Sequence, residues 1–314
     1  MRRSIAVALF GVGVATAAGL GARPGPSMAV PSALSRAGGD DVPAAKVGAL
    51  PVVPAAAPGT ALGGAHPPSP APVPGPPGRM LLMGDSVARS IGPTLVAVAR
   101  EHGVDMHNAA ISGCGLVEGI TSTPDGVLFP WSLGCAGAIA GYQEEKIREF
   151  QPDVVVWLSA WETANRTLAD GAVVLPGTRH GNLRLLGEID RAAVRLRAGG
   201  ARLVMVLLAP VPQGSEEFTK DTTIHRLSRL NAMLENYARR HADSVSVVYM
   251  SEFLCPNGPP CPAEVGGTIP RPDGIHFDDP AGARWAAEQL FPRLVAPLLP
   301  GEPPAWGYVG VGRV

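Results

Sequence analysis

The fold is decided by the stretch Met80-Leu81-Leu82-Met83-Gly84-Asp85-Ser86, where a strongly patterned part of the chain begins. Its four apolar residues predict a short buried strand, and the spacing of apolar residues over 87–102 predicts a helix directly after it. This order places Ser86 at the carboxyl end of a strand, close to the amides of a helix start, which can bind a developing oxyanion. Ser86 is therefore a candidate nucleophile. The alternative is that Asp85 and Ser86 only cap the helix.

The rest of 79–300 alternates short apolar runs with longer amphipathic segments. Further strands are expected at 104–111, 153–158, 202–208 and 245–250, and helices at 138–150, 183–198, 222–241 and 280–298. The valine run before Leu158 is typical of a strand that is buried on both faces of a parallel sheet. The fold class is therefore predicted to be α/β, a three-layer α/β/α sandwich with a mainly parallel five-stranded sheet.

A second candidate motif, Arg271-Pro272-Asp273-Gly274-Ile275-His276, stands just before the last expected helix. A serine hydroxyl needs a base to take its proton, and imidazole is suited to this near neutral pH. With a turn at Gly274, the Asp273 carboxylate would reach His276 and hold its tautomer. The alternative is a surface turn with a capping aspartate. In a doubly wound sheet, sites form at the carboxyl ends of the strands, so Ser86 and His276 are expected to meet there.

A first-strand Gly-Asp-Ser with a late Asp-x-x-His resembles the SGNH hydrolases, also called GDSL hydrolases, over roughly 79–298. The segment Asn108-Ala109-Ala110-Ile111-Ser112-Gly113 is similar to the second block of that family. The resemblance implies a Ser86–His276–Asp273 triad, with the backbone amides of Ser86 and Gly113 binding the oxyanion. The expected fold is that of the SGNH hydrolases, which is flavodoxin-like.

The third block departs from the family pattern. Gly-x-Asn-Asp is usual there, and its asparagine is an oxyanion donor, but this chain has Ser159-Ala160-Trp161-Glu162. Trp161 or Asn165 would have to replace the donor; the alternatives are a packing role for Trp161 and a polar helix start at Asn165. Asp85 and Glu162 are candidate substrate-binding residues, with a buried ion pair as the alternative for Glu162.

The same Trp-Glu pair, together with a Cys-bracketed loop before Asp273, looks like the periplasmic SGNH domains fused to membrane acyltransferase-3 proteins. That resemblance implies work on O-acyl groups of cell-envelope sugars, beside a separate membrane acyltransferase or alone. The expected function is a serine esterase for short acyl esters, O-acetyl first among them. The alternatives are an O-acyltransferase with a glycan acceptor and a catalytically weak glycan-binding domain.

Composition argues against several other classes of protein. A formal net charge of -1 and 5% aromatic residues give no support for nucleic-acid binding. The histidines lack metal-ligand spacing, so neither a metal nor another cofactor is expected. The oligomeric state is not predicted.

The N-terminus indicates export. Arg2 and Arg3 precede the apolar run 5–20, so 1–22 is expected to be a signal peptide or a membrane anchor. Residues 23–78, rich in Ala and Pro, are expected to form a disordered tether, and 301–314 a flexible tail. A secreted or cell-envelope location is therefore predicted.

Four cysteines outside the signal agree with export. Their spacing favours two local disulfides, Cys114–Cys135 and Cys255–Cys261, although the sequence leaves other pairings open. The first would close a loop of about twenty residues, for which about 3 kcal/mol of stabilisation is expected. It would also brace the loop of Gly113; the alternative is a reactive thiol at Cys114.

Overall fold

The computed structural model describes residues 78–135, 138–215 and 221–296. The predicted export segment, the predicted tail and all but the last residue of the predicted tether lie outside these residues. Residues 297–300, with which the expected domain ends, lie outside them too.

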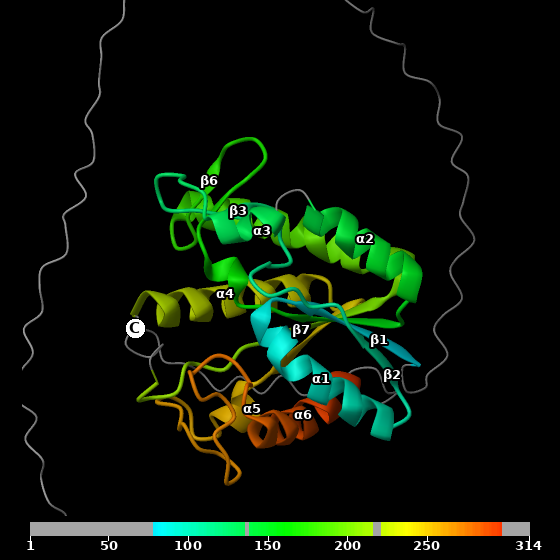
Figure 1. The fold of residues 1–314 in the computed structure, drawn as a ribbon. Helices are drawn as coiled ribbons and strands as arrows, with labels where there is room; N and C mark the ends of the chain where they lie inside the picture. The colour runs from blue at the N-terminus through cyan, green and yellow to red at the C-terminus, as the bar shows by residue number, and fades with distance from the viewer. Residues whose placement is uncertain (1–77, 136–137, 216–220, 297–314) are drawn as a thin grey trace, which may run out of the picture. The chain divides into compact units, whose positions relative to one another are not determined.

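A five-stranded parallel sheet forms the centre of the domain (Figure 1). Its order is β2-β1-β4-β7-β8, and each neighbouring pair is parallel. The strands are β1 (Arg79–Gly84), β2 (Asp105–Asn108), β4 (Val154–Leu158), β7 (Arg202–Leu207) and β8 (Val245–Tyr249). The chain leaves β1 toward β2 on one side and resumes at β4 on the other, which makes β1/β4 the switch point of the topology. Ligands of open α/β sheets bind at such a point, outside the carboxyl ends of the strands.

Helices cover both faces of the sheet, which confirms the three-layer prediction (Figure 1). One face carries α1 (Ser86–Glu101), α5 (Ser251–Leu254) and α6 (Pro280–Val295). The other carries α2 (Ala138–Phe150), α3 (Arg179–Leu196) and α4 (Asp221–Arg240). Helix α3 begins four residues earlier than expected, because the Thr178 side chain accepts a hydrogen bond from Gly181 N and caps it there.

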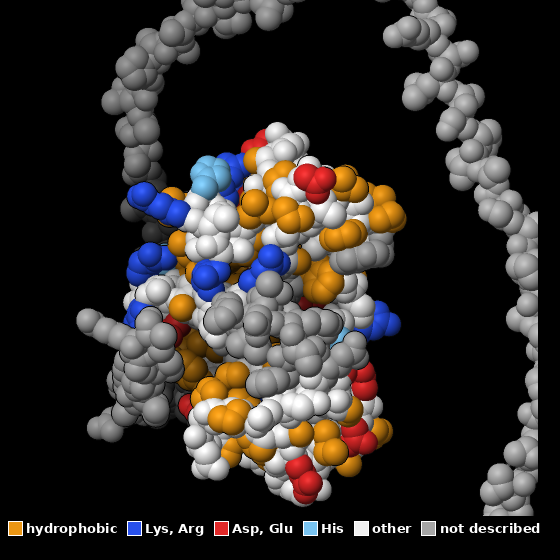
Figure 2. Space-filling view, turned by 90° about the vertical axis from the view of Figure 1, so that its left-hand side faces the viewer, with side chains coloured by type: hydrophobic (Ala, Val, Ile, Leu, Met, Phe, Trp, Pro, Cys, Tyr) orange, Lys and Arg blue, Asp and Glu red, His pale blue; other side chains and the backbone are white. Residues whose placement is uncertain are grey.

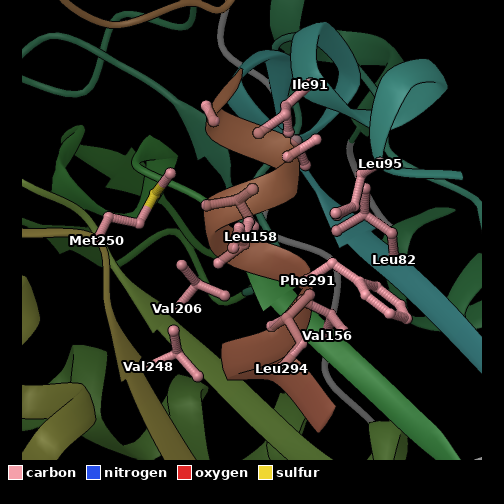
Figure 3. Packing of buried hydrophobic residues seen from close by; sticks show 14 of the residues in the cluster. Leu82, Ile91, Leu95, Val156, Leu158, Val206, Val248, Met250, Phe291 and Leu294 are labelled. Atoms are coloured by element: carbon pink, nitrogen blue, oxygen red, sulfur yellow. The ribbon is translucent and has the colours of Figure 1, made fainter. Parts of the chain in front are cut away.

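The strands are buried on both faces because alternate residues join different cores. Leu82, Val156 and Val206 pack toward α1 and α6, whereas the intervening Leu81 and Val155 pack toward the opposite helices. Figure 3 shows the first of these cores. Side chains of β1, β4, β7 and β8 meet those of Ile91 and Leu95 from α1 and Phe291 and Leu294 from α6. These two cores enclose the sheet between the two layers of helices.

A small three-stranded antiparallel sheet, in the order β3-β5-β6, was not predicted. Its strands are β3 (Ile120–Thr121), β5 (Arg166–Thr167) and β6 (Val173–Val174). Two residues cannot show the alternation by which a strand is recognised in sequence. The described part of the chain also contains the short 3-10 helices η1 (Pro130–Cys135), η2 (Trp161–Thr163) and η3 (Ala198–Gly200).

Figure 2 views the molecule from the left-hand side of Figure 1. Lys and Arg side chains, in blue, lie mainly in the upper half of that face, and hydrophobic side chains, in orange, form several separate groups. Scattered apolar groups of this kind are ordinary for a protein surface.

Candidate active site

Ser86 is the first residue of α1, two residues after β1 ends at Gly84. Asp85 caps the helix, because its Oδ1 accepts a hydrogen bond of 2.8 Å from Val87 N. Gly84 brings β1 close to β4: a Cβ there would lie 1.8 Å from the carbonyl oxygen of Leu158. Glycine is therefore required at this position, and the tight turn presents Ser86 at the switch point of the sheet.

His276 and Asp273 approach Ser86 from the loop before α6. The Oγ of Ser86 lies 2.7 Å from Nε2 of His276, and Nδ1 of His276 lies 2.6 Å from Oδ2 of Asp273. With the proton on Nδ1, His276 donates to Asp273 and accepts from the Ser86 hydroxyl. That is the arrangement in which imidazole takes the proton of an attacking serine.

The loop is shaped so that Asp273 meets its own histidine. Oδ1 of Asp273 accepts hydrogen bonds from Ile275 N (2.8 Å) and His276 N (2.7 Å), which leaves Oδ2 for the ring. Gly274 has a φ of 97°, a left-handed conformation that glycine adopts without strain. Both features belong to the Asp-Gly turn expected in the sequence.

Partial burial by itself would raise the pKa of Asp273. The hydrogen bond from the His276 ring and those from the two backbone amides outweigh it and hold the pKa below its ordinary value. The carboxylate is therefore ionised at neutral pH. It stabilises the imidazolium that forms when His276 accepts a proton.

Arg271 is a site residue whose role sequence reasoning missed. Its side chain is buried, and its two terminal nitrogens donate to the carbonyl oxygens of Ala209 (3.1 Å) and Pro210 (2.9 Å). Burial lowers the pKa of Arg271 to about 10, against the opposing attraction of Asp273. Its own carbonyl accepts from Gly274 N at 2.9 Å. Arg271 thereby fastens the Asp273 turn to the segment that follows β7. The position of Arg271 at the start of the motif that contains Asp273 and His276 was the one signal in the sequence that could have indicated this role.

Asp85 was expected to bind substrate, but the structure gives its carboxylate a different role. Besides capping α1, it accepts hydrogen bonds through Oδ2 from Ser159 Oγ (3.1 Å), Ala160 N (2.8 Å) and Trp161 N (2.8 Å). Only 1% of the residue is exposed. Asp85 thus ties the segment after β4 to the start of α1, and both of its carboxylate oxygens accept hydrogen bonds from the protein itself.

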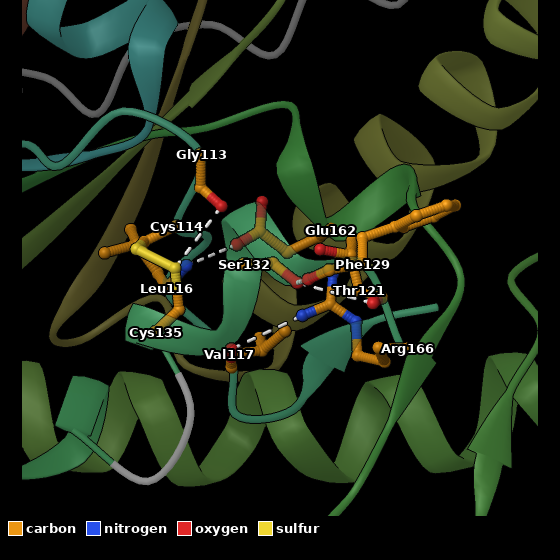
Figure 4. The surroundings of a disulfide bond; sticks show 10 residues. All are labelled: Gly113, Cys114, Leu116, Val117, Thr121, Phe129, Ser132, Cys135, Glu162 and Arg166. Atoms are coloured by element: carbon orange, nitrogen blue, oxygen red, sulfur yellow. Dashed lines mark hydrogen bonds between the residues drawn. A yellow bond between two sulfur atoms is a disulfide. The ribbon is translucent and has the colours of Figure 1, made fainter. Parts of the chain in front are cut away.

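Glu162, the other expected substrate-binding residue, is fully buried. Its Oε1 accepts a hydrogen bond of 2.6 Å from Leu116 N, which joins η2 to the loop after Gly113 (Figure 4). Arg166 lies nearby and is buried as well, with its Nη2 donating to the Trp161 carbonyl at 2.7 Å. The alternative of a buried structural role therefore describes Glu162 better than substrate contact.

Gly113, Trp161 and Asn165 are the candidate oxyanion donors beside the amide of Ser86. Ile111 N donates to the Gly84 carbonyl at 2.9 Å, so the loop that carries Gly113 lies directly beside the end of β1. Trp161 borders the pocket at Ser86. Asn165 does not border it, and its backbone carbonyl accepts from Ser122 N at the small sheet. Between the two candidates for the third donor, the pocket lining therefore favours Trp161 over Asn165.

The cysteines form Cys114–Cys135 and Cys255–Cys261, the two pairs that their spacing favours. Figure 4 shows the first disulfide beside Gly113. Sγ of Cys135 lies 3.4 Å from the Gly113 carbonyl oxygen. The bond therefore braces the loop that carries Gly113.

A pocket of about 240 Å³ opens beside Ser86 and His276. It lies among η2, the segment after β7, helix α4 and the Asp273 turn. The pocket thus provides space for a substrate next to the candidate nucleophile.

Potential ligand atoms of Asp273, His276 and Asp278 lie within 4.8 Å of one another. Asp273 and His276 are already joined in the chain of hydrogen bonds that ends at Ser86, which gives this cluster a simpler explanation than a metal. Within 78–135, 138–215 and 221–296, no helix combines the length and the apolar character that a membrane span requires.

Comparison with known proteins places the sequence in a family. A model of the family described as "SGNH domain (fused to AT3 domains)" matches residues 58–290. No curated protein matches the sequence.

Solved structures with similar folds include enzymes of several kinds. A GDSL-like lipase from Bacteroides thetaiotaomicron is 17% identical, with 69% of this chain and 87% of that chain covered and a TM-score of 0.46. The periplasmic domain of a lipopolysaccharide acetyltransferase from Salmonella ser. Paratyphi A is 13% identical, with 68% and 82% covered and a TM-score of 0.46. The C-terminal catalytic domain of peptidoglycan O-acetyltransferase A from Streptococcus pneumoniae is 15% identical, with 70% and 94% covered and a TM-score of 0.38.

Proposed function

We propose, since the chain belongs to the family of SGNH domains that occur fused to AT3 domains, that it is an exported serine esterase for short acyl esters. Its substrates would be acylated carbohydrates or cell-envelope polymers, with O-acetyl groups among the acyl groups removed. The chain of hydrogen bonds from Ser86 through His276 to Asp273, at 2.7 Å and 2.6 Å, carries this proposal. The two disulfides agree with an oxidising compartment outside the cytoplasm.

In the proposed mechanism, Oγ of Ser86 attacks the ester carbonyl while Nε2 of His276 takes its proton. The amides of Ser86 and Gly113 donate to the oxyanion, with the indole N–H of Trp161 as the third donor. The C–O bond to the sugar then breaks, and His276 returns the proton to the leaving alcohol. Water, deprotonated by His276, cleaves the acyl-Ser86 ester and releases the carboxylic acid.

A second candidate function is favoured by the fusion of family members to AT3 domains. The same acyl-Ser86 ester would then be attacked by a sugar hydroxyl instead of water, which makes the protein an O-acyltransferase. Every residue of the first half-reaction is shared by the two functions. A membrane acyltransferase would be the natural source of the acyl group.

The full chain should hydrolyse p-nitrophenyl acetate, and Ser86→Ala and His276→Ala should each reduce kcat to the level of the uncatalysed reaction. Equal turnover by the folded variants would overturn the proposal. Adding oligosaccharide acceptors and following acyl-sugar by mass spectrometry separates the two candidate functions. An esterase releases free acid regardless of acceptor, whereas a transferase forms acyl-sugar at the expense of free acid.

A further inference from the structure

The walls of the pocket beside Ser86 are made mainly of hydrocarbon. Leu208, Val211 and Leu227 are all buried, with at most 7% exposed, and Ile275 adds a half-buried side chain next to His276. They come from the segment after β7, from α4 and from the Asp273 turn. Three separate segments therefore present apolar side chains to the same space.

The polar groups along that wall are already bound to other parts of the protein. Arg271 donates to the carbonyls of Ala209 and Pro210, so those three groups satisfy one another. The Leu208 carbonyl accepts from Asn231 Nδ2 at 2.7 Å.

Polar groups of the lining that follow β1 and β4 are bound within the protein as well. The Thr163 hydroxyl donates to the Ala160 carbonyl at 2.7 Å, and the Asp85 carboxylate accepts the donors described above. A sugar ring needs several hydrogen-bonding partners in its site, because a polar group that is buried without one loses free energy. The lining groups named above, on Asp85, Thr163, Leu208 and Arg271, have their partners within the protein. The lining therefore suits the hydrocarbon part of the ester better than its sugar part.

The volume of the pocket limits the size of that hydrocarbon. An apolar protein cavity of about 150 Å³ holds a benzene molecule, which has six carbon atoms. The pocket at Ser86 measures about 240 Å³ and opens to the outside, so the methyl of an acetyl group would leave most of it empty.

We propose that this pocket is an acyl-binding subsite for an unbranched aliphatic chain of about four to six carbons, which makes such an acyl group, rather than acetyl, the preferred one. The inference rests on the proposed function and specifies its acyl group. The sugar of the ester then lies outside the pocket, beyond the Ser86–His276 pair.

The first test is the specificity of the full chain for p-nitrophenyl esters from acetate to decanoate. We expect kcat/KM to rise about fourfold for each methylene added up to pentanoate, since each removes further apolar surface from water. We expect it to fall beyond hexanoate. Highest kcat/KM for acetate, or a rise that continues to decanoate, would overturn the acyl-pocket proposal while leaving the esterase proposal intact.

A binding measurement keeps the inference testable where turnover fails. Ser86→Ala retains the pocket and cannot form the acyl-enzyme, so calorimetric titration with the intact esters measures affinity alone. Tighter binding of the pentanoate than of the acetate supports the subsite even if the wild type proves to have no esterase activity. Equal affinity for the two esters would refute it.

Substitutions at Leu227 test whether this residue limits the length of the acyl chain that the pocket accepts. Leu227→Ala should move the optimum to longer esters by one or two carbons, and Leu227→Phe should move it toward acetate. Leu183→Ala and Leu183→Phe, at a site on α3 with 61% of the residue exposed, are the matched controls and should leave the profile unchanged. Circular dichroism checks that each variant is folded. An unchanged profile in folded Leu227 variants would exclude this pocket as the acyl subsite.

Discussion

Oγ of Ser90 accepts a hydrogen bond of 3.0 Å from the backbone N of Phe277, although 187 residues separate them in the chain. Ser90 lies one helical turn beyond Ser86 on α1, and Phe277 directly follows His276. The same hydroxyl donates to the Val87 carbonyl at 2.9 Å. One contact thus holds the loop of the candidate base against the helix of the candidate nucleophile.

Ser90→Ala is therefore expected to lower kcat about tenfold with little change in KM. Removing the acceptor leaves a part-buried amide without its partner, a loss of about 1–3 kcal/mol that loosens His276 relative to Ser86. Steady-state kinetics with p-nitrophenyl acetate measures kcat and KM of the variant and the wild type. Ser90→Thr, which keeps the hydroxyl, is the control. Identical kcat in Ser90→Ala and the wild type would rule out this positioning role.

Asp273→Asn should reduce kcat by about a hundredfold to ten-thousandfold, because the amide lacks the charge that stabilises imidazolium and can favour the wrong tautomer. Asp278→Asn removes a carboxylate two residues beyond His276, on an exposed residue, and serves as the matched control. Its kcat should stay within about twofold of the wild type. A similar loss in both variants would mean that the local negative charge matters, not the contact with Nδ1.

The stability of the protein should depend on pH through Asp85. Burial, and next to it repulsion from Glu162, raise the pKa of Asp85 to about 6, against the ordinary 3.8. A group whose pKa is raised by folding stabilises the fold below its unfolded pKa and loses that contribution as pH rises through the folded pKa. The difference between the two pKa values corresponds to about 3 kcal/mol of stabilisation, which is lost as the pH rises from about 4 to about 7.

Urea unfolding of the wild type and of Asp85→Asn, from pH 4.5 to 7.5, measures this contribution. The free energy of unfolding of the wild type, relative to the variant, should fall as pH rises, because the variant has no titrating group at this position. Other carboxylates titrate in both proteins and cancel in the difference. If the free energy of unfolding of the wild type relative to the variant stays constant, or increases with pH, the pKa of Asp85 is not raised by folding.

The Cys114–Cys135 disulfide should contribute both to stability and to turnover. It joins residues 21 positions apart, so Cys114→Ala with Cys135→Ala should lower the free energy of unfolding by about 3 kcal/mol. The double variant should also have a lower kcat, because the loop of Gly113 loses its brace to η1. Cys255→Ala with Cys261→Ala opens a loop of only 6 residues and should lose less stability. Unchanged kcat in the first double variant would separate this disulfide from the oxyanion loop.

Much of the architecture was predictable from local pattern. The apolar runs that became β1, β4, β7 and β8 predicted a parallel sheet, and all five sheet strands overlap the expected segments. The small sheet β3-β5-β6 could not be predicted, because its two-residue strands are held by long-range pairing rather than by any periodicity of their own.

The candidate site shows the same division. Ser86 and the Asp273–His276 pair were found because each belongs to a short motif with its own chemistry and its own place at the end of a structural element. Burial argues against the substrate-binding roles considered for Asp85 and Glu162, and the sequence could not show this, since carboxylates near a nucleophile look alike whether they face solvent or backbone amides. Arg271 and Ser90 were missed because their partners, Ala209, Pro210 and Phe277, are remote in the chain.

The sequence by itself determined the order of the five strands of the large sheet and of the long helices between them. It also determined the identity of the candidate nucleophile and base, and the Asp-Gly turn that orients His276. All of these depend on neighbours within a few residues. Only the tertiary structure decided that Ser86 and His276, 190 residues apart, lie 2.7 Å from each other. It also decided that Asp85 and Glu162 face inward and that hydrocarbon lines the pocket. The physical reason is that burial and hydrogen-bond partners are properties of packed segments. They arise only when the sheet brings the ends of its strands to one edge.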